Sequence, residues 1–282
     1  ERAVVPLADA VTLDWVRRGA GPAYTRIRLF GSLGFVALAQ ALGLALSARG
    51  DRPGDRLVPL AVALCTAGYA AAAARLALPA PVAPRPSGRD ALALLRDRRL
   101  IALLLACALH WGACAPFHLL FGVFVRDLGL PARVTGLAAA SGVGAEVLAL
   151  LAYPRIAARF GARAVFAVAF AGTALRWALL ARAASPAAVV LLQLLHALTF
   201  GLFWGASMQA MAALVPTPLR ATGQALYAAV VFGGGNAVGY QLAGWGYDRL
   251  GGVGPLFGWA AGVELAPLAL AAALAAPRRD RV

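Results

Sequence analysis

Residues 100–125 read LIALLLACALHWGACAPFHLLFGVFV and contain no Asp, Glu, Lys or Arg. Because a helix rises about 1.5 Å per residue, a stretch of this length is long enough to cross a bilayer core of about 30 Å. Other apolar runs of similar character lie on either side of it. Together the eight runs are 27–48, 57–78, 100–125, 132–153, 162–183, 187–214, 219–247 and 253–276. The sequence therefore predicts an all-α fold: a polytopic membrane helix bundle with eight spans.

The basic residues are distributed by loop. The net charge is +14, and the arginines gather before the first run, after the last, and in every second loop. The opposite loops hold fewer, partly offset by Asp51, Asp55, Asp127 and Asp248. Since arginine-rich loops stay in the cytoplasm, we expect a multi-pass protein of the cytoplasmic (inner) membrane with its C-terminus inside. We also expect the protein to be a monomer. Charge spread over loops, rather than striped on one element, excludes a nucleic-acid partner and leaves the lipid bilayer.

The longest polar connection, 79–99, suggests how the chain is organised. Its prolines prevent the flanking helices from continuing through it, so we assign it as a cytoplasmic linker. Six runs follow it, and six spans form half of a twelve-span transporter, so 100–282 is predicted to be a C-terminal six-helix half. Residues 1–78 would be the remnant of an N-terminal half, comprising the end of its fourth span and its fifth and sixth spans. We therefore expect the chain to be incomplete.

Cysteine and histidine side chains share one face of the run 100–125. Cys107, His110, Cys114 and His118 fall within about 80° of one another on a helix. Their helix rises about 16 Å over this distance, whereas zinc ligands lie about 2 Å from one ion, so they cannot form a four-ligand site. At most one neighbouring pair could join a site shared with another helix. Like Cys65, the cysteines are expected to be small buried side chains, and no metal or cofactor is predicted.

Ionisable residues inside apolar runs are the candidate functional groups, because each costs about 2.5–3.5 kcal/mol at mid-helix. Glu146, Arg176 and His196 lie in three successive runs and are predicted to form one polar constellation facing a cavity. Glu146 would bind and release a proton, and Arg176 would alternate between that carboxylate and an anionic or hydroxylated substrate group. His196 would hydrogen-bond the substrate or orient its neighbours. The alternative is a buried ion pair that only holds helices together.

Two further runs add polar candidates. In 187–214, one helical face is predicted to line a cavity for a partly apolar solute, with ordinary interhelical packing as the alternative; its members are Gln193, His196, Phe200, Trp204, Ser207 and Met211. In 219–247, Asn236 is a candidate ligand, and the spacing of Gly235 and Gly239 permits close helix approach. Glu264, in the last run, is expected to be peripheral.

The blocks PLADAVTLDW (6–15) and YTRIRLFGSLGFVALAQALG (24–43) resemble the fourth-to-fifth helix region of the major facilitator superfamily. The closest likeness is to the branch of phenylpropionate permease-like and lactose permease-like proton symporters. The block LLQLLHALTFGLFWGAS (191–207) is similar to the tenth helix of the same branch. Those symporters carry a carboxylate one turn after the equivalent of His196. Thr199 occupies that position here, so Glu146 would have to carry the proton.

The block YPRIAARFGAR (153–163) resembles the second-half copy of the cytoplasmic loop motif of this superfamily, a Gly, three residues, then Asp-Arg-x-Gly-Arg. Arg159 and Gly161 match the motif and Arg163 lies one position after its last arginine; the resemblance implies that these three residues form a cytoplasmic gate. Asp9 could pair with Arg28 at the same gate. A literal match to Gly-xxx-Asp-Arg-x-Gly at 244–251 falls on the outer face, where we expect a glycine-terminated helix end instead.

The resemblance implies a secondary active transporter that moves a small organic solute, by proton symport with alternating access. Its partners would be a small-molecule substrate and protons. A non-transporting membrane receptor or scaffold on the same fold, and a proton-independent facilitator, are the alternatives. The chain has neither a GxSxG nor an HExxH pattern, so an enzyme is not expected.

Overall fold

A computed structural model describes residues 24–52, 54–75 and 88–273. Within these residues every regular element is a helix, which confirms the predicted all-α class. The elements are α2 (Tyr24–Ala48), α3 (Leu57–Ala74), α4 (Gly88–Leu94), α5 (Arg98–Ala113), α6 (Ala115–Asp127), α7 (Arg133–Leu180), α8 (Pro186–Leu191), η1 (Leu192–Leu195), η2 (Ala197–Leu202), α9 (Phe203–Leu214), η3 (Thr217–Leu219), α10 (Arg220–Tyr227), η4 (Ala228–Gly235), α11 (Asn236–Leu250), α12 (Val253–Val263) and α13 (Leu265–Ala273). In the described part, six helices are long and apolar enough to cross a membrane.

The helix α7 contains two of the predicted runs. Its 48 residues are divided at Gly161, whose φ of 71° and ψ of 161° are not helical. A positive φ is a conformation that glycine adopts without the steric penalty of a Cβ, so the chain can turn there between two spans. The helix α11 ends similarly at Gly251, with φ of 74°. This confirms that the literal motif match at 244–251 is a helix end.

The chain divides into two compact units. The first consists of Glu1–Arg85 with Leu130–Ala140, and the second of Pro86–Gly129 with Ser141–Val282. In the first unit, the end of α2 and the loop after it hold the beginning of α7, because Ser47 Oγ accepts from Arg133 N at 3.0 Å and Asp51 Oδ1 accepts from Ala132 N at 3.2 Å. In the same loop, the hydrogen bond from the Arg49 guanidinium lowers the pKa of the Asp55 carboxyl. Cys65, on α3, is exposed, so the prediction that all cysteines are buried is wrong for this one.

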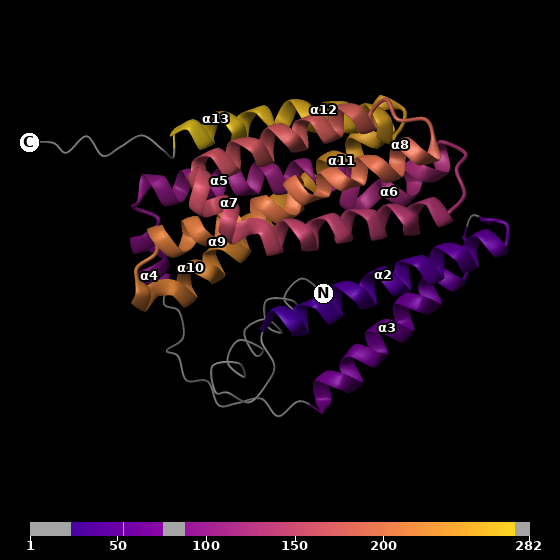
Figure 1. Cartoon of the computed structure of the whole chain (residues 1–282), viewed down its shortest axis with the longest axis horizontal. Coiled ribbons are helices and arrows are strands. Elements are labelled where there is room, and N and C mark those ends of the chain that lie inside the picture. The colour runs from indigo at the N-terminus through magenta and orange to yellow at the C-terminus, as the bar shows by residue number, and fades with distance from the viewer. Residues whose placement is uncertain (1–23, 53, 76–87, 274–282) are drawn as a thin grey trace, which may run out of the picture. The chain divides into compact units, whose positions relative to one another are not determined.

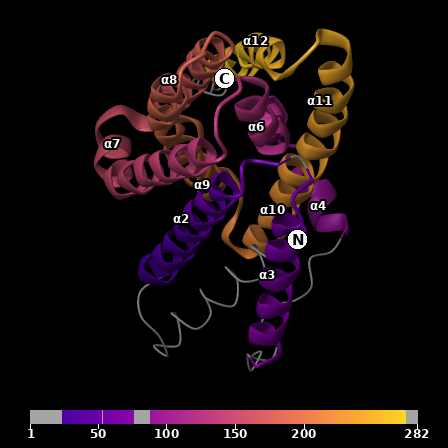
Figure 2. The same cartoon turned by 90° about the vertical axis from the view of Figure 1, so that its right-hand side faces the viewer.

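In the second unit, α5 supplies much of the core, with Leu100 and Leu103 fully buried. The helices α12 and α13 run beside α6 and α5 respectively (Figure 1). The helices α6, α11 and α12 also contact one another (Figure 2). A Cβ added to Gly239 would lie 2.7 Å from the carbonyl oxygen of Gly112, and one on Gly235 would lie 2.8 Å from that of Ala108. The predicted close helix approach at these two glycines is therefore confirmed, and the partner helix is α5.

Several helices of the second unit are irregular at mid-length. The segments η2 and η4 are π-helical, whereas η1 is a 3₁₀ turn. Two other irregularities follow from proline: α5 and α6 are separated at Cys114, two residues before Pro116, and α12 and α13 at Glu264, three before Pro267. A proline provides no backbone N–H to the preceding turn. Because π-helical turns and breaks leave backbone carbonyls for side chains to bind, they are frequent at functional sites.

Candidate functional site

Glu146, Arg176, His196 and Gln193 form one continuous chain of polar contacts. His196 Nε2 lies 3.3 Å from Glu146 Oε2, and its Nδ1 lies 3.1 Å from Arg176 Nη1. Arg176 Nη2 donates to the side-chain oxygen of Gln193. The sequence placed these residues on three successive runs, and the structure brings them together. Arg176 and Glu146 are joined through the imidazole of His196 rather than by a direct contact.

We call these four residues the Glu146–Gln193 cluster. Two helices that approach each other closely position its side chains. A Cβ on Gly142, in α7, would lie 3.4 Å from Cβ of His196. One turn further on, a Cβ on Gly201 would lie 3.2 Å from the carbonyl oxygen of Glu146. Since neither glycine carries a side chain, α7 lies directly against the η1–η2 segment. The short distance lets the Glu146 carboxylate reach His196.

The hydrogen-bond chemistry assigns the protons of the cluster. A guanidinium can only donate, so Nδ1 of His196 must be the acceptor, and the proton of the neutral imidazole is on Nε2, facing Glu146. Gln193 accepts from Arg176 and donates its Nε2 to the Val189 carbonyl at 2.8 Å, which fixes the orientation of the amide. The arrangement therefore contains an arginine cation, a neutral histidine and a Glu146 carboxyl group that faces the imidazole N–H.

The cluster is buried at one end and partly open at the other. Arg176 and Gln193 have no exposed surface, whereas the side chains of His196 and Glu146 are 14% and 12% exposed. The guanidinium carbon of Arg176 lies 4.4 Å from the ring centroid of Phe117 and 4.6 Å from that of Trp177. The faces of these two rings attract the buried Arg176 cation and so stabilise it away from water. Only the Glu146 end can exchange a proton without the helices first moving apart.

A row of aromatic rings continues from the open end. His196, Phe200 and Trp204 stack in sequence, with centroids 5.8 and 5.9 Å apart. Trp204 stacks on Phe232, and Trp111 packs against both Phe200 and Phe232. The face predicted from helical periodicity therefore exists up to Trp204. Ser207 and Met211, which were predicted to share it, are buried, and Ser207 Oγ donates to the Phe203 carbonyl at 2.8 Å.

The other predicted site residues lie outside this cluster. Asn236 is buried and donates to the Phe232 carbonyl at 2.6 Å, while its Oδ1 has no hydrogen-bond partner in the described residues. Arg159 and Arg163 are exposed on either side of Gly161. Asp9 lies outside the described residues, and Arg28 is described only as part of α2.

His110 and Glu264 form a second ionisable pair, which the sequence did not predict. His110 Nδ1 lies 2.9 and 3.0 Å from the two carboxylate oxygens of Glu264, and neither residue has exposed surface. The expectation that Glu264 is peripheral is therefore wrong. Two signals could have indicated the pair: each residue is ionisable within an otherwise uncharged run, and each is followed within six residues by a proline.

Comparisons with known proteins agree with this architecture. The maltose permease of Geobacillus stearothermophilus is 33% identical over 242 residues, covering 85% of this chain and 59% of the permease. A protein of Escherichia coli K12 named "Probable 3-phenylpropionic acid transporter" is 28% identical over 257 residues, covering 88% of this chain and 65% of that protein. The chain thus spans less than two thirds of the length of these relatives.

A third relative, sugar efflux transporter B of Salmonella typhimurium LT2, is 28% identical over 163 residues, or 57% of this chain and 38% of the transporter. The family model described as "MFS_1 like family" matches residues 1–257. That match covers the described residues up to 257, the cluster and the blocks that resembled the major facilitator superfamily. The resemblance is confirmed, and this multi-pass membrane chain belongs to the MFS_1 like family.

Proposed function

We propose that this chain is part of a secondary active transporter that moves a small organic solute together with a proton. Its two halves would expose a midplane site to the two membrane faces in turn. The observation that carries this proposal is the continuous contact chain from Glu146 through His196 to Arg176 and Gln193. Charged groups are held inside an otherwise apolar helix bundle, where they are expensive unless they serve a function or pair with one another.

Glu146 is the proposed proton carrier. Its carboxyl group faces the His196 N–H, its side chain is 12% exposed, and one neutral imidazole separates it from the Arg176 cation. Protonation of Glu146 would weaken its attraction for the His196 N–H and release the imidazole to turn. Arg176 would then lose an acceptor and be free to bind a substrate oxygen. Proton binding and substrate binding are linked in this way through His196.

The proposed substrate has an apolar face and a hydrogen-bonding or anionic group. The stacked rings of Phe200 and Trp204 offer a surface for the apolar face, and Arg176 with Gln193 offers donors for the polar group. The names of the relatives, a maltose permease and a phenylpropionic acid transporter, fit the same description. Asn236, on the helix after these rings, is a further proposed ligand.

The proposed organisation follows the family. Residues 1–78 would belong to the N-terminal half, 79–99 to a cytoplasmic linker and 100–282 to the six-helix half, in a monomer. The arginine-rich loops support a location in the cytoplasmic membrane with the C-terminus inside. Arg159, Gly161 and Arg163, with Asp9 and Arg28, are the proposed cytoplasmic gate. A reporter fused after residue 282 that is active only in the cytoplasm would support this orientation.

Uptake by the full-length natural protein in proteoliposomes tests the proposal. Radiolabelled maltose, 3-phenylpropionate and a panel of sugars, nucleosides and organic acids would be supplied with and without an inward proton gradient. We expect at least one solute to accumulate only with the gradient and to equilibrate without it. Uptake that is the same with and without the proton gradient would instead identify a proton-independent facilitator. No flux of any solute would favour the receptor or scaffold.

A further inference from the structure

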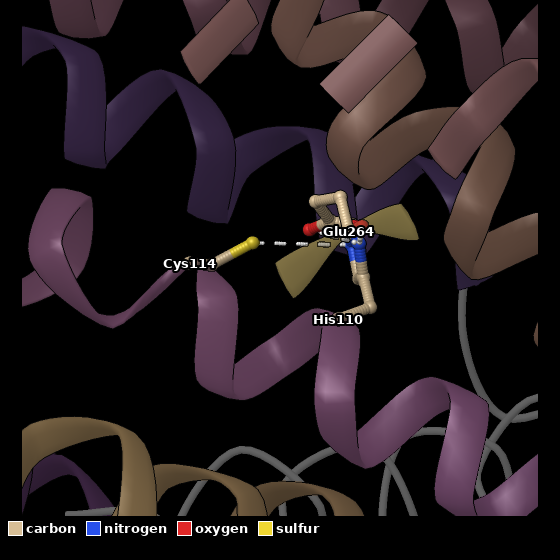
Figure 3. A group of neighbouring side chains, drawn as sticks. All are labelled: His110, Cys114 and Glu264. Atoms are coloured by element: carbon tan, nitrogen blue, oxygen red, sulfur yellow. Dashed lines mark hydrogen bonds and ion pairs between the residues drawn. The ribbon is translucent and has the colours of Figure 1, made fainter. Parts of the chain in front are cut away.

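The His110–Glu264 pair joins two helix breaks. His110 lies on the last turn of α5, just before the break at Cys114, and Glu264 is itself the break between α12 and α13. Figure 3 shows the side chains of His110, Cys114 and Glu264 pointing toward one another. The two residues are 154 positions apart in the sequence. Both are fully buried, so neither exchanges protons with water in this conformation.

The hydrogen bonds of His110 require a proton between the pair. Nε2 lies 2.9 Å from the backbone carbonyl oxygen of Thr199, which can only accept, so Nε2 carries hydrogen. If the imidazole were neutral, Nδ1 would present a lone pair to the carboxylate at 2.9–3.0 Å. Two acceptors repel at this distance unless a proton lies between them. Either the imidazole is a cation beside a carboxylate, or a carboxylic acid donates to a neutral imidazole.

The same reasoning gives the opposite result at His196. There Nδ1 accepts from Arg176, and the single imidazole proton is on Nε2, which lies 3.3 Å from Glu146 Oε2. No additional proton is needed at Glu146. The structure therefore combines one pair whose contacts require an additional proton, His110–Glu264, with a carboxyl group whose contacts require none, Glu146.

A metal ion is the other occupant to consider, because one ligand atom from each of His110, Cys114 and Glu264 lies within 4.8 Å of the others. Ligands about 2.0–2.3 Å from a tetrahedral zinc ion are more than about 3.2 Å apart. His110 Nδ1 and Glu264 Oε2 are closer than this, because they lie at a hydrogen-bond distance of 3.0 Å. Cys114 Sγ lies 3.9 Å from His110 Nε2, the nitrogen that donates to the Thr199 carbonyl. The geometry favours a shared proton.

Few groups around the pair could compensate the negative charge of the Glu264 carboxylate if the shared proton were lost. The His110 ring packs against Phe170 and Phe203, with centroids 5.4 and 4.1 Å away, and both oxygens of the Glu264 carboxyl group lie within 3.0 Å of His110 Nδ1. The titratable groups that act on the pair are Cys107 and Cys114 of α5, with His196 beyond them, and Arg176 of α7 acts on Cys114. None of them contacts the Glu264 carboxylate. Loss of the proton would leave Glu264 as a buried carboxylate without a cation in contact.

The pair is also connected to the first cluster. The carbonyl of Thr199 that binds His110 belongs to η2, the π-helical segment that begins one residue after His196. A change of protonation at His110 would therefore act on the segment that positions the imidazole of His196. We propose that His110 and Glu264 form a second proton-binding site, which reports its state to the Glu146–Gln193 cluster through Thr199. Its role in transport rests on the proposed function.

Infrared pH-difference spectroscopy of the full-length natural protein in lipid bilayers tests this site. The parent spectrum should contain a carboxyl component and an imidazole component that appear and disappear reversibly as the pH is changed. Glu264→Gln should lose both, because an amide cannot share the proton. Cys114→Ser, which alters the neighbouring thiol alone, should keep both. Glu264→Asp should keep a carboxyl component at a shifted position, so the test survives if Glu264→Gln does not fold.

Two results would overturn the proposal. One is a Glu264→Gln spectrum identical to that of the parent. The other is one equivalent of zinc retained by the parent after incubation with Zn²⁺ and lost in Cys114→Ser, which would make the cluster a metal site. The measurement needs no substrate, so it is separate from the transport proposal. If the Glu264-dependent infrared components are present but uptake does not depend on the proton gradient, proton symport is rejected and the second proton-binding site is supported.

Discussion

Arg176 donates a hydrogen bond of 3.1 Å from Nη1 to Nδ1 of His196, and this contact decides which nitrogen of the imidazole carries the proton. Nε2–H then faces Glu146. The histidine therefore transmits the effect of a protonation change from the carboxylate to the guanidinium without becoming charged itself. The predictions for the first cluster follow from this arrangement.

Substitution of Arg176 should impair every mode of transport. Arg176→Ala leaves Gln193 and His196 without their donor, and each buried polar group left unpaired costs about 1–3 kcal/mol. We expect both gradient-driven accumulation and counterflow exchange to fall by more than tenfold in proteoliposomes. Arg182→Ala, which removes an exposed arginine beyond the end of α7, is the control and should transport like the parent. Full exchange by Arg176→Ala would reject a substrate role for the guanidinium.

Substitution of His196 should separate proton coupling from substrate binding. The Oδ1 of Asn occupies the position of Nδ1, so His196→Asn keeps an acceptor for Arg176 but no longer reaches Glu146. Accumulation driven by a proton gradient should be lost, whereas exchange at equal pH should persist. His196→Gln, which mimics Nε2, should lose the Arg176 contact and reduce exchange as well. Equal behaviour of the two variants would contradict the assigned hydrogen bonds.

The aromatic surface should contribute to substrate affinity. Trp111 packs at 5.8 Å from Phe200 and 4.9 Å from Phe232, at the edge of the stacked rings. Aromatic contacts contribute about 0.5–1.5 kcal/mol beyond area burial, so Trp111→Leu should raise the apparent KM by up to about tenfold. Trp259→Leu changes a tryptophan that is 57% exposed, and it should leave KM unchanged. An equal KM for the two variants would place the substrate elsewhere.

The contact between α5 and α11 should tolerate no larger side chain. A Cβ on Gly239 already falls 2.7 Å from a backbone oxygen of Gly112, so Gly239→Leu must push the helices apart at a cost of about 1–3 kcal/mol or more. The melting temperature of the purified protein should fall. Gly244→Leu is the matched control on the same helix, because nothing lies within 4 Å of an added Cβ there. A melting temperature unchanged in Gly239→Leu would show that this contact is not tightly packed.

The sequence predicts most of the fold because hydrophobic length is a local property. Runs of uncharged residues are readable without knowing their neighbours, and so is the cost of placing Glu146, Arg176 or His196 among them. The order of contacts was harder to predict, since the imidazole lies between the two charged groups. The π-helical turn of η2 could not be predicted either, because helical periodicity assumes a regular helix.

The His110–Glu264 pair could not be predicted by the same reasoning. Its two residues come from distant parts of the chain, and their contact depends on how α5 packs against α13. Each residue is also placed by a local break, at Cys114 and at Glu264 itself, that apolar length does not reveal. Ionisable residues near a proline in an uncharged run are the sequence signal that indicates such a pair.

Glu146→Gln provides the most direct test of proton coupling. The full-length natural protein and this variant would be reconstituted, and accumulation under an inward proton gradient would be compared with counterflow exchange at equal pH, using the solute identified by uptake. Because an amide accepts from the His196 N–H but cannot bind a proton, we predict that accumulation is abolished while exchange stays within about twofold of the parent. Accumulation by Glu146→Gln equal to that of the parent would contradict the proposed role of Glu146.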